Sequence, residues 1–336
     1  MHIYLHVGAG KCGSSSIQRH FSENNIIERF AYGALRVDGK IIEGDAVKRR
    51  ARLSESNYAA SYTFNQLIDK KFSDNLKNSL SILSKRYDSL LLSSEAWMNK
   101  NEIFSNLDSV FSDYQVTVIV VIRPPVKWYN SAWWQWGVWE SDSVERWVNN
   151  RKVVCPEQWG DCVQAYSEIS FVSSIHVLNL EGDLIQSLCN ILHINNSPTV
   201  TDIKHNTGSS FELLSFMKQN RVLRPRPHDS RNEFVLNKYL KARSKAPWVL
   251  SEFLIEDILR RNERNYKLLS DYSSDLDFLQ QRSWWDKGYY DKHQCSNLSL
   301  ELDVETISSM LEEAYSIIIS LDKKNKRLNE YLTKQL

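Results

Sequence analysis

A glycine-rich loop near the start of the chain carries the residue types that bind an anion. An apolar run at residues 2–7 leads into Gly8-Ala9-Gly10-Lys11-Cys12-Gly13, and three serines follow. Glycines let backbone amides approach a ligand closely. A helix that begins at the serines would direct its free amides and its positive dipole end at the same ligand. Lys11 adds a mobile cation, so we predict a site for phosphate or sulfate. The residues assigned to it are Gly10, Lys11, Cys12, Gly13, Ser14, Ser15 and Ser16.

A second anion site is predicted at the end of the most β-branched run in the chain. Residues 116–122 end in Arg123, and two prolines follow. Ligands of α/β proteins bind at the carboxyl ends of parallel strands, and a guanidinium there can hold a phosphate through two hydrogen bonds. Ser131 lies eight residues later, two turns along a helix expected for residues 125–140, and could reach the same group.

These two signatures resemble those of the sulfotransferases that use 3′-phosphoadenosine 5′-phosphosulfate (PAPS). Lys11-Cys12-Gly13-Ser14-Ser15 is similar to their 5′-phosphosulfate loop, K-x-G-[TS]-[TS], and Arg123 with Ser131 resembles their 3′-phosphate site. Ser131-Ala132-Trp133-Trp134-Gln135, and more loosely the stretch from Asn206 to Asn220, look like the bacterial carbohydrate-type branch. The resemblance implies a P-loop-like sulfotransferase fold, PAPS as the donor, adenosine 3′,5′-bisphosphate as the product, and no required metal.

Transfer to a hydroxyl needs a base, and Lys11 would stabilise the charge that develops on the departing phosphate. Family members use a histidine or a glutamate, and Glu95, directly after the apolar run 89–94, looks like the glutamate version. It would then lie at the same sheet edge as Lys11. His6 lies inside the first strand and is expected to be a core histidine, while His205 is a third candidate.

The region between residues 128 and 159 contains seven of the eleven tryptophans of the chain. At helical spacing, Trp128, Trp136 and Trp139 are expected to face the core. Trp133 and Trp134 would face elsewhere and could form a platform for sugar rings. With Gln135, they are the predicted substrate residues. The expected acceptor is a small molecule or oligosaccharide, most simply a carbohydrate.

The elements that must position these residues follow from the apolar patterning. Uninterrupted apolar runs predict strands, and helical spacing between them predicts a mostly parallel α/β sheet flanked by helices. After about residue 205 only helices are expected. The sequence predicts an α/β core at residues 1–205 and a helical portion at 206–336 packed on it as one continuous domain. The strands are expected at 2–7, 89–94, 116–122 and 174–180, and the helices from Ser14 and at 62–71, 75–86, 125–140, 182–192, 211–219, 233–242, 251–269 and 304–321.

Composition narrows the class of protein. The 336 residues carry a net charge of +1, which argues against a nucleic-acid partner or a polybasic membrane patch. The five cysteines form no C-x-x-C pair, so a reducing, cytoplasmic setting is expected. No apolar stretch is long enough for a membrane span. The oligomeric state is left open.

Two alternative functions remain open. A nucleotide-dependent kinase of P-loop type would need the Walker pattern, in which the lysine follows the last glycine, whereas Lys11 precedes Gly13. The second alternative is a non-catalytic carbohydrate-binding protein on the same fold.

The glycine-rich loop also comes close to a dinucleotide-binding pattern. That pattern would need an acidic residue about 20 positions on, after a second strand, and Glu28 lies in no convincing strand.

Overall fold

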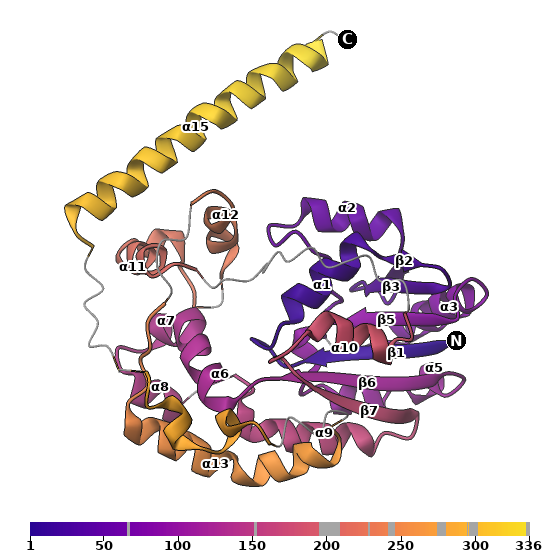
Figure 1. The fold of residues 1–336 in the computed structure, drawn as a ribbon. Coiled ribbons are helices and arrows are strands. Elements are labelled where there is room, and N and C mark those ends of the chain that lie inside the picture. The colour runs from indigo at the N-terminus through magenta and orange to yellow at the C-terminus, as the bar shows by residue number, and fades with distance from the viewer. Residues whose placement is uncertain are drawn as a thin grey trace.

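The computed structural model describes residues 1–65, 68–150, 153–194, 209–227, 229–240, 246–273, 280–293, 295 and 302–333. Its centre is a twisted sheet in the order β2-β3-β5-β1-β6-β7, with β4 beside β3 (Figure 1). Five strands, β3, β5, β1, β6 and β7, run parallel, and β2 and β4 are antiparallel to β3. The predicted mostly parallel α/β architecture is therefore confirmed. The strands are β1 His2–Gly8, β2 Ile26–Ile27, β3 Phe30–Leu35, β4 Ile41–Ile42, β5 Ser89–Ser93, β6 Gln115–Ile122 and β7 Val172–Asn179.

The central strands are apolar along almost their whole length because both faces of the sheet are covered. Leu5 of β1 lies between Leu92 of β5 and Val118 of β6, and all three are buried. Since these strands are parallel, their carboxyl ends meet at one edge of the sheet. The segments that follow β1, β5 and β6 therefore begin side by side, although they are far apart in the sequence.

Helices of the sheet region begin where local chemistry satisfies their free amides. Asp69 accepts from the amide of Phe72 at the start of α3, and Asp183 accepts from that of Gln186 at the start of α10. The helices are α1 Ser14–Glu23, α2 Asp45–Leu53, α3 Lys70–Ser84, η1 Glu95–Trp97, α4 Asn101–Ser105, α5 Asp108–Phe111, α8 Val144–Asn150, η3 Pro156–Gln158, α9 Trp159–Ser167 and α10 Leu184–Ile191.

The tryptophan-rich helix is one continuous rod with a widened turn in its middle. It consists of α6 Pro125–Ala132, the π-helical turn η2 Trp133–Gly137, and α7 Val138–Glu140. Pro125 suits the first turn of α6 because backbone N–H groups there have no intrahelical acceptor, so the N–H that proline lacks is not needed. Gly137 fits because a Cβ there would lie 2.3 Å from Trp133 Cε3 and 2.7 Å from Trp147 Cδ2. A helix was predicted here, but the π-turn was not.

Two expectations for the first hundred residues differ from the structure. Strand β3 was not predicted, because Phe-Ala-Tyr-Gly-Ala-Leu has no β-branched residue. Its Gly33 is required by packing, since a Cβ would lie 2.8 Å from Ile41 Cγ2. The helix predicted at 62–71 is wrong: helix starts only at Lys70. The Tyr62 amide donates instead to the Leu35 carbonyl at 2.8 Å, and the Tyr62 carbonyl accepts from the Trp97 indole.

The carboxyl-terminal portion is helical, as predicted. The helix α13 lies against α6 and α9, and α15 extends well beyond its predicted end at 321. The elements are α11 Phe211–Gln219, η4 Arg221–Leu223, α12 Arg231–Tyr239, α13 Glu252–Asp271, η5 Arg282–Trp284, η6 Lys287–Tyr290 and α15 Val304–Thr333. Residues 195–208 lie outside the described residues, and with them the expected boundary at 205/206, His205, and Asn206 to Gly208. Within the described part of the chain, no helix has the length and apolar character to span a membrane.

Candidate active site

The loop between β1 and α1 is held in a conformation that depends on glycine. Gly8, Lys11 and Gly13 have positive φ values of 130°, 65° and 90°. A Cβ on Gly8 would lie 2.9 Å from the Glu95 carbonyl oxygen, and one on Gly13 would lie 2.7 Å from Leu180 Cδ1. Gly13 is the N-cap of α1, and no side chain caps this helix. The Ser16 amide donates to the Gly13 carbonyl at 2.9 Å, so the amides of Ser14 and Ser15 are those of the first turn that remain available to a ligand.

The other predicted loop residues have structural contacts of their own. The Cys12 side chain is fully buried, and burial raises the pKa of its thiol to about 12. The Ser14 hydroxyl donates to the Ala9 carbonyl at 3.3 Å, and the Ser15 hydroxyl lies 3.5 Å from the Tyr58 hydroxyl. The Cys12 amide also donates within the loop, to the Ala9 carbonyl at 3.3 Å, so a ligand would meet the backbone of Ser14 rather than the side chains of Cys12 and Ser14. Ser16 follows in the first turn of α1.

Lys11 and Arg123 lie on adjacent strand ends and are in contact. Arg123 Nη1 donates to the Lys11 carbonyl at 3.3 Å, so the guanidinium stands beside the loop. Its Nε is buried and, among the described residues, has no hydrogen-bond partner. Burial lowers the pKa of Arg123, and Glu181 opposes that shift. Arg123 is therefore a half-buried cation with one buried donor that no described residue uses.

Ser131 lies on α6, half-buried, one helical turn beyond Lys127. Lys127 forms an ion pair with Glu181 and donates to the Tyr289 hydroxyl at 3.0 Å. This contact ties the helix after β6 to the segment after β7 and to η6. Lys127 and Glu181 were not predicted as site residues, because an isolated lysine and glutamate 54 positions apart give no local sequence signal.

Glu95 begins η1 directly after β5 and so lies at the same edge of the sheet. Its Oε2 is 3.9 Å from the position that a Cβ on Gly10 would occupy. The side chain is exposed, but desolvation by the segments packed near it raises the pKa of Glu95, and Lys11 opposes the shift. Among the described residues, the carboxyl has no hydrogen-bond or ion-pair partner.

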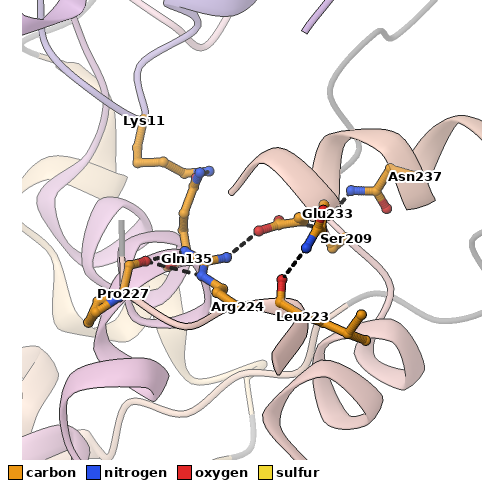
Figure 2. A network of polar contacts seen from close by, with 9 residues as sticks. Lys11, Gln135, Ser209, Leu223, Arg224, Pro227, Glu233 and Asn237 are labelled. Atoms are coloured by element: carbon orange, nitrogen blue, oxygen red, sulfur yellow. Dashed lines mark hydrogen bonds and ion pairs between the residues drawn. The ribbon is translucent and has the colours of Figure 1, made fainter. Parts of the chain in front are cut away.

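Gln135 of the π-helical turn accepts a hydrogen bond from the Lys11 ammonium (Figure 2). This contact connects the loop to the tryptophan-rich helix. Burial lowers the pKa of Lys11, with the Glu233 and Glu95 carboxylates opposing the shift and Arg123 adding to it. The structure therefore places Gln135, which was predicted as a substrate residue, against the lysine.

A buried ion pair from the carboxyl-terminal portion extends this contact. Arg224 is 1% exposed; it pairs with Glu233 and donates to the Gln135 and Pro227 carbonyls (Figure 2). Glu233 also accepts from the Ser209 hydroxyl. The guanidinium lies over the Trp139 ring, 4.6 Å from its centroid. None of this network was predicted, because only the fold brings these distant segments together.

The same carboxyl-terminal segment supplies three cations to the end of the tryptophan-rich helix. Lys218, Arg221 and Arg224 donate to the carbonyls of Val138, Trp139 and Gln135, respectively. The Val138 and Trp139 carbonyls lie in the last turn, where carbonyls lack intrahelical partners and carry the negative end of the helix dipole, and the Gln135 carbonyl lies in the π-helical turn. Cations three residues apart on α11, on η4 and directly after η4 therefore hold this helix in place.

Trp128 and Trp139 are buried in the core, as predicted, whereas Trp133, Trp134 and Trp136 differ from the prediction. Trp133 and Trp134 are 6% and 5% exposed; Trp133 stands edge-on to Trp147, and Trp134 donates to the Pro247 carbonyl at 2.8 Å. Neither ring offers an open platform for a sugar. Trp136, expected in the core, is half-buried, and its Cη2 is 3.6 Å from the Cβ position of Gly10. The π-turn inserts an extra residue, which rotates the following side chains relative to a regular helix.

His6 is a core residue, as expected. It is fully buried, its Nδ1 lies 2.7 Å from the Ser93 hydroxyl, and burial lowers its pKa to about 4. The imidazole is therefore neutral at physiological pH and has no route to a bound acceptor. Glu28 lies between β2 and β3, at the opposite edge of the sheet from the loop, so it cannot complete a dinucleotide site. Within the described residues, no three His, Cys, Asp or Glu side chains are grouped to hold a metal ion.

Comparison with known proteins adds one structural likeness. No protein-family model and no curated protein matches the chain. Among solved structures, the chain is similar to a sulfotransferase from Alicyclobacillus acidocaldarius, with 14% sequence identity and a TM-score of 0.35. The match covers 68% of this chain and 93% of that protein.

Proposed function

We propose that this protein is a sulfotransferase that moves a sulfuryl group from PAPS to a hydroxyl acceptor. The observation that carries the proposal is the contact between Arg123 and the Lys11 carbonyl, 3.3 Å across two adjacent strand ends. It brings two anion-binding signatures, 112 residues apart in the sequence, to one place. A carboxylate without a partner, Glu95, lies beside them on the third strand end. The sequence resemblance supplies the chemical identity of the ligand.

The donor fits the groups present at this edge. The uncapped first turn of α1 and Lys11 would hold the 5′-phosphosulfate, because amides and an ammonium both favour an anion. Arg123, with its unused buried Nε, and Ser131 would hold the 3′-phosphate. When bound, PAPS supplies an activated sulfuryl group whose leaving group is a phosphate.

The protein contributes positioning and charge stabilisation to the transfer. The Lys11 ammonium, steadied by Gln135, stands where negative charge develops on the leaving phosphate oxygen. Glu95 accepts the proton of the acceptor hydroxyl as the new S–O bond forms. Its raised pKa suits this role, because a base whose pKa approaches the working pH transfers protons more effectively.

The acceptor side of the proposal rests on Trp136 rather than on Trp133 and Trp134. Its half-buried ring lies next to Gly10, within the same group of segments as Glu95. An indole combines a large apolar face with one N–H donor, and sugar rings stack on such faces. We therefore include a carbohydrate acceptor in the proposal.

Calorimetry with adenosine 3′,5′-bisphosphate tests the nucleotide part of the proposal, and an acceptor screen with labelled PAPS tests the transfer. We expect tight binding that Arg123→Ala weakens selectively for nucleotides with a 3′-phosphate. Equal loss for adenosine 5′-monophosphate would reject the assigned role of Arg123. Magnesium-dependent turnover of ATP would favour the kinase alternative. Sugar binding without any labelled product would favour the non-catalytic alternative.

A further inference from the structure

The last helix of the described chain presents an apolar face to solvent. α15 runs for 30 residues, Val304–Thr333, and stands apart from the body of the protein (Figure 1). Large apolar side chains along it are exposed, for example Val304 at 83%, Leu311 at 49% and Ile318 at 59%. Exposed aliphatic residues at regular spacing on one helix indicate a surface that another molecule covers.

The spacing of these residues is that of a coiled coil. Starting at Val304, steps of three and four residues alternate through Ile307, Leu311, Ala314, Ile318, Leu321 and Asn325, and the sequence continues the pattern at Leu328 and Leu332. In heptad terms, the a positions are 304, 311, 318, 325 and 332, and the d positions are 307, 314, 321 and 328. Eight of the nine are apolar. The repeat spans about four heptads, the length at which a sustained pattern indicates a coiled coil.

We call the row of a and d positions the seam. Its one polar residue, Asn325, determines how a partner helix must be oriented and aligned. Asn325 occupies an a position, where a buried amide is unfavourable unless another amide pairs with it. In an antiparallel pair each a residue faces a d residue, and every d residue of this helix is apolar. In a parallel pair shifted by one heptad, Asn325 would face Ile318 or Leu332. Only a parallel pair in register brings Asn325 opposite its own counterpart.

We propose that α15 joins two copies of this chain through a parallel, in-register, two-stranded coiled coil. A β-branched residue at a and leucine at d, as at Ile318 and Leu321, favour two strands. The flanking positions agree with this register. Across the interface, Ile317 would face Asp322 and Lys324 would face Asn329 of the partner copy, so no like charges meet.

A lipid surface fits the same helix less well. Helices that lie on membranes carry a polar face rich in lysine and arginine along their length. The polar residues of α15 are acidic in its first half, at Glu312 and Glu313, and basic only in its second half, at Lys323 and Lys326. Half of the helix would thus be repelled by anionic lipid, whereas a second copy needs no such face.

Sedimentation equilibrium of the full chain tests the proposal, with two adjacent isoleucines as a matched pair. Ile318 and Ile319 are 59% and 55% exposed, but only Ile318 lies in the seam. We expect the unmodified protein to be dimeric, Ile318→Glu to weaken the dimer at least 100-fold, and Ile319→Glu to leave it within about threefold. A monomeric unmodified protein, or equal effects of the two substitutions, would overturn the proposal. Circular dichroism verifies that both variants are folded.

Disulfide formation tests the orientation. Val304→Cys is made in a Cys295→Ser background, because Cys295 is the exposed cysteine of the described residues. A parallel pair in register places the two engineered thiols together, so oxidation should give a covalent dimer. An antiparallel pair separates them by about 40 Å, at 1.5 Å per residue along the helix. A stable dimer that does not cross-link would reject the parallel arrangement.

Discussion

The Arg224 guanidinium donates to the main-chain carbonyl of Gln135, whose side chain accepts a hydrogen bond from Lys11. Three segments far apart in the sequence are joined by these two contacts: the loop after β1, the tryptophan-rich helix, and the carboxyl-terminal portion. The lysine at the candidate site is thus positioned by residues that no local motif identifies.

Loss of Arg224 should destabilise the protein strongly. Arg224→Met leaves the Glu233 carboxylate buried without its cation, and breaking a buried pair in this way costs about 3–5 kcal/mol. The matched control is Arg226→Met, since Arg226 is 79% exposed and only 3.9 Å from Asp229, where a surface pair contributes about 0–1 kcal/mol. Urea denaturation measures both. Similar losses in the two variants would show that the Arg224 pair is unimportant.

Gln135→Leu should lower kcat more than it changes the affinity for the donor. The substitution removes the acceptor that holds the Lys11 ammonium, and a hydrogen bond to a charged group contributes about 1.5–3 kcal/mol. If that loss falls on the transition state, kcat decreases about 10- to 100-fold. Steady-state kinetics with PAPS give the split between kcat and KM. Gln164→Leu, on the exposed face of α9, is the control, and equal kcat in both variants would refute the role of Gln135.

The sequence predicts the central fold well, because uninterrupted apolar runs identify buried parallel strands. The predicted strands at 2–7, 89–94, 116–122 and 174–180 all appear within two residues of their observed ends. Strand β3 was missed because its packing demands small residues such as Gly33, which have low β propensity. The register of the sheet then brings Lys11, Glu95 and Arg123 to one edge, as expected for parallel strands.

Side-chain directions were harder to predict than elements. The orientation of the tryptophans was predicted from a regular helix, and the π-turn at Trp133–Gly137 changes it for Trp133, Trp134 and Trp136. Contacts such as Arg224 with Gln135 depend on how α11 and η4 dock on the sheet domain, and one sequence has no signal for docking between segments. The roles of Lys11, Glu95 and Arg123 themselves stay predictions that binding and kinetics must test.

Glu95→Gln should remove the acid limb of the pH–rate profile. The base acts when ionised, and burial raises the pKa of Glu95, so kcat/KM of the unmodified protein should rise with pH through a pKa above the ordinary 4.5. The variant should lose about 10²- to 10⁴-fold in kcat and show a flat profile over that range. An unchanged profile would exclude Glu95 as the base.

The same substitution should stabilise the fold at neutral pH. Because the folded-state pKa of Glu95 is raised, the folded protein favours its protonated form, and stability falls as pH increases through that pKa. A glutamine avoids this cost. Thermal unfolding should therefore show a higher Tm for Glu95→Gln at neutral pH, and the difference should disappear in acid. A lower Tm at neutral pH would contradict the cause assigned to the shift.

Trp136→Ala and Trp133→Ala should affect different properties. Trp136 is half-buried beside Gly10, so its loss should mainly raise the KM for a carbohydrate acceptor. Trp133 is 6% exposed, and removing a buried tryptophan costs about 3–5 kcal/mol of unfolding free energy. Acceptor titrations and urea denaturation separate the two effects. If Trp136→Ala leaves the acceptor KM unchanged, the carbohydrate part of the proposal loses its support.

The left-handed backbone conformation of Lys11 lowers the stability of the loop, although the proposed reaction needs the lysine side chain at this position. A φ of 65° costs an ordinary L-residue about 1–2 kcal/mol, and glycine escapes that cost. Glycine would therefore be the most stable residue at position 11, but it has no ammonium group. Lys11→Gly should unfold no more easily than Lys11→Ala while both are inactive. If variants were selected only for thermal stability, we would therefore expect replacement of Lys11 by glycine, with loss of the proposed activity.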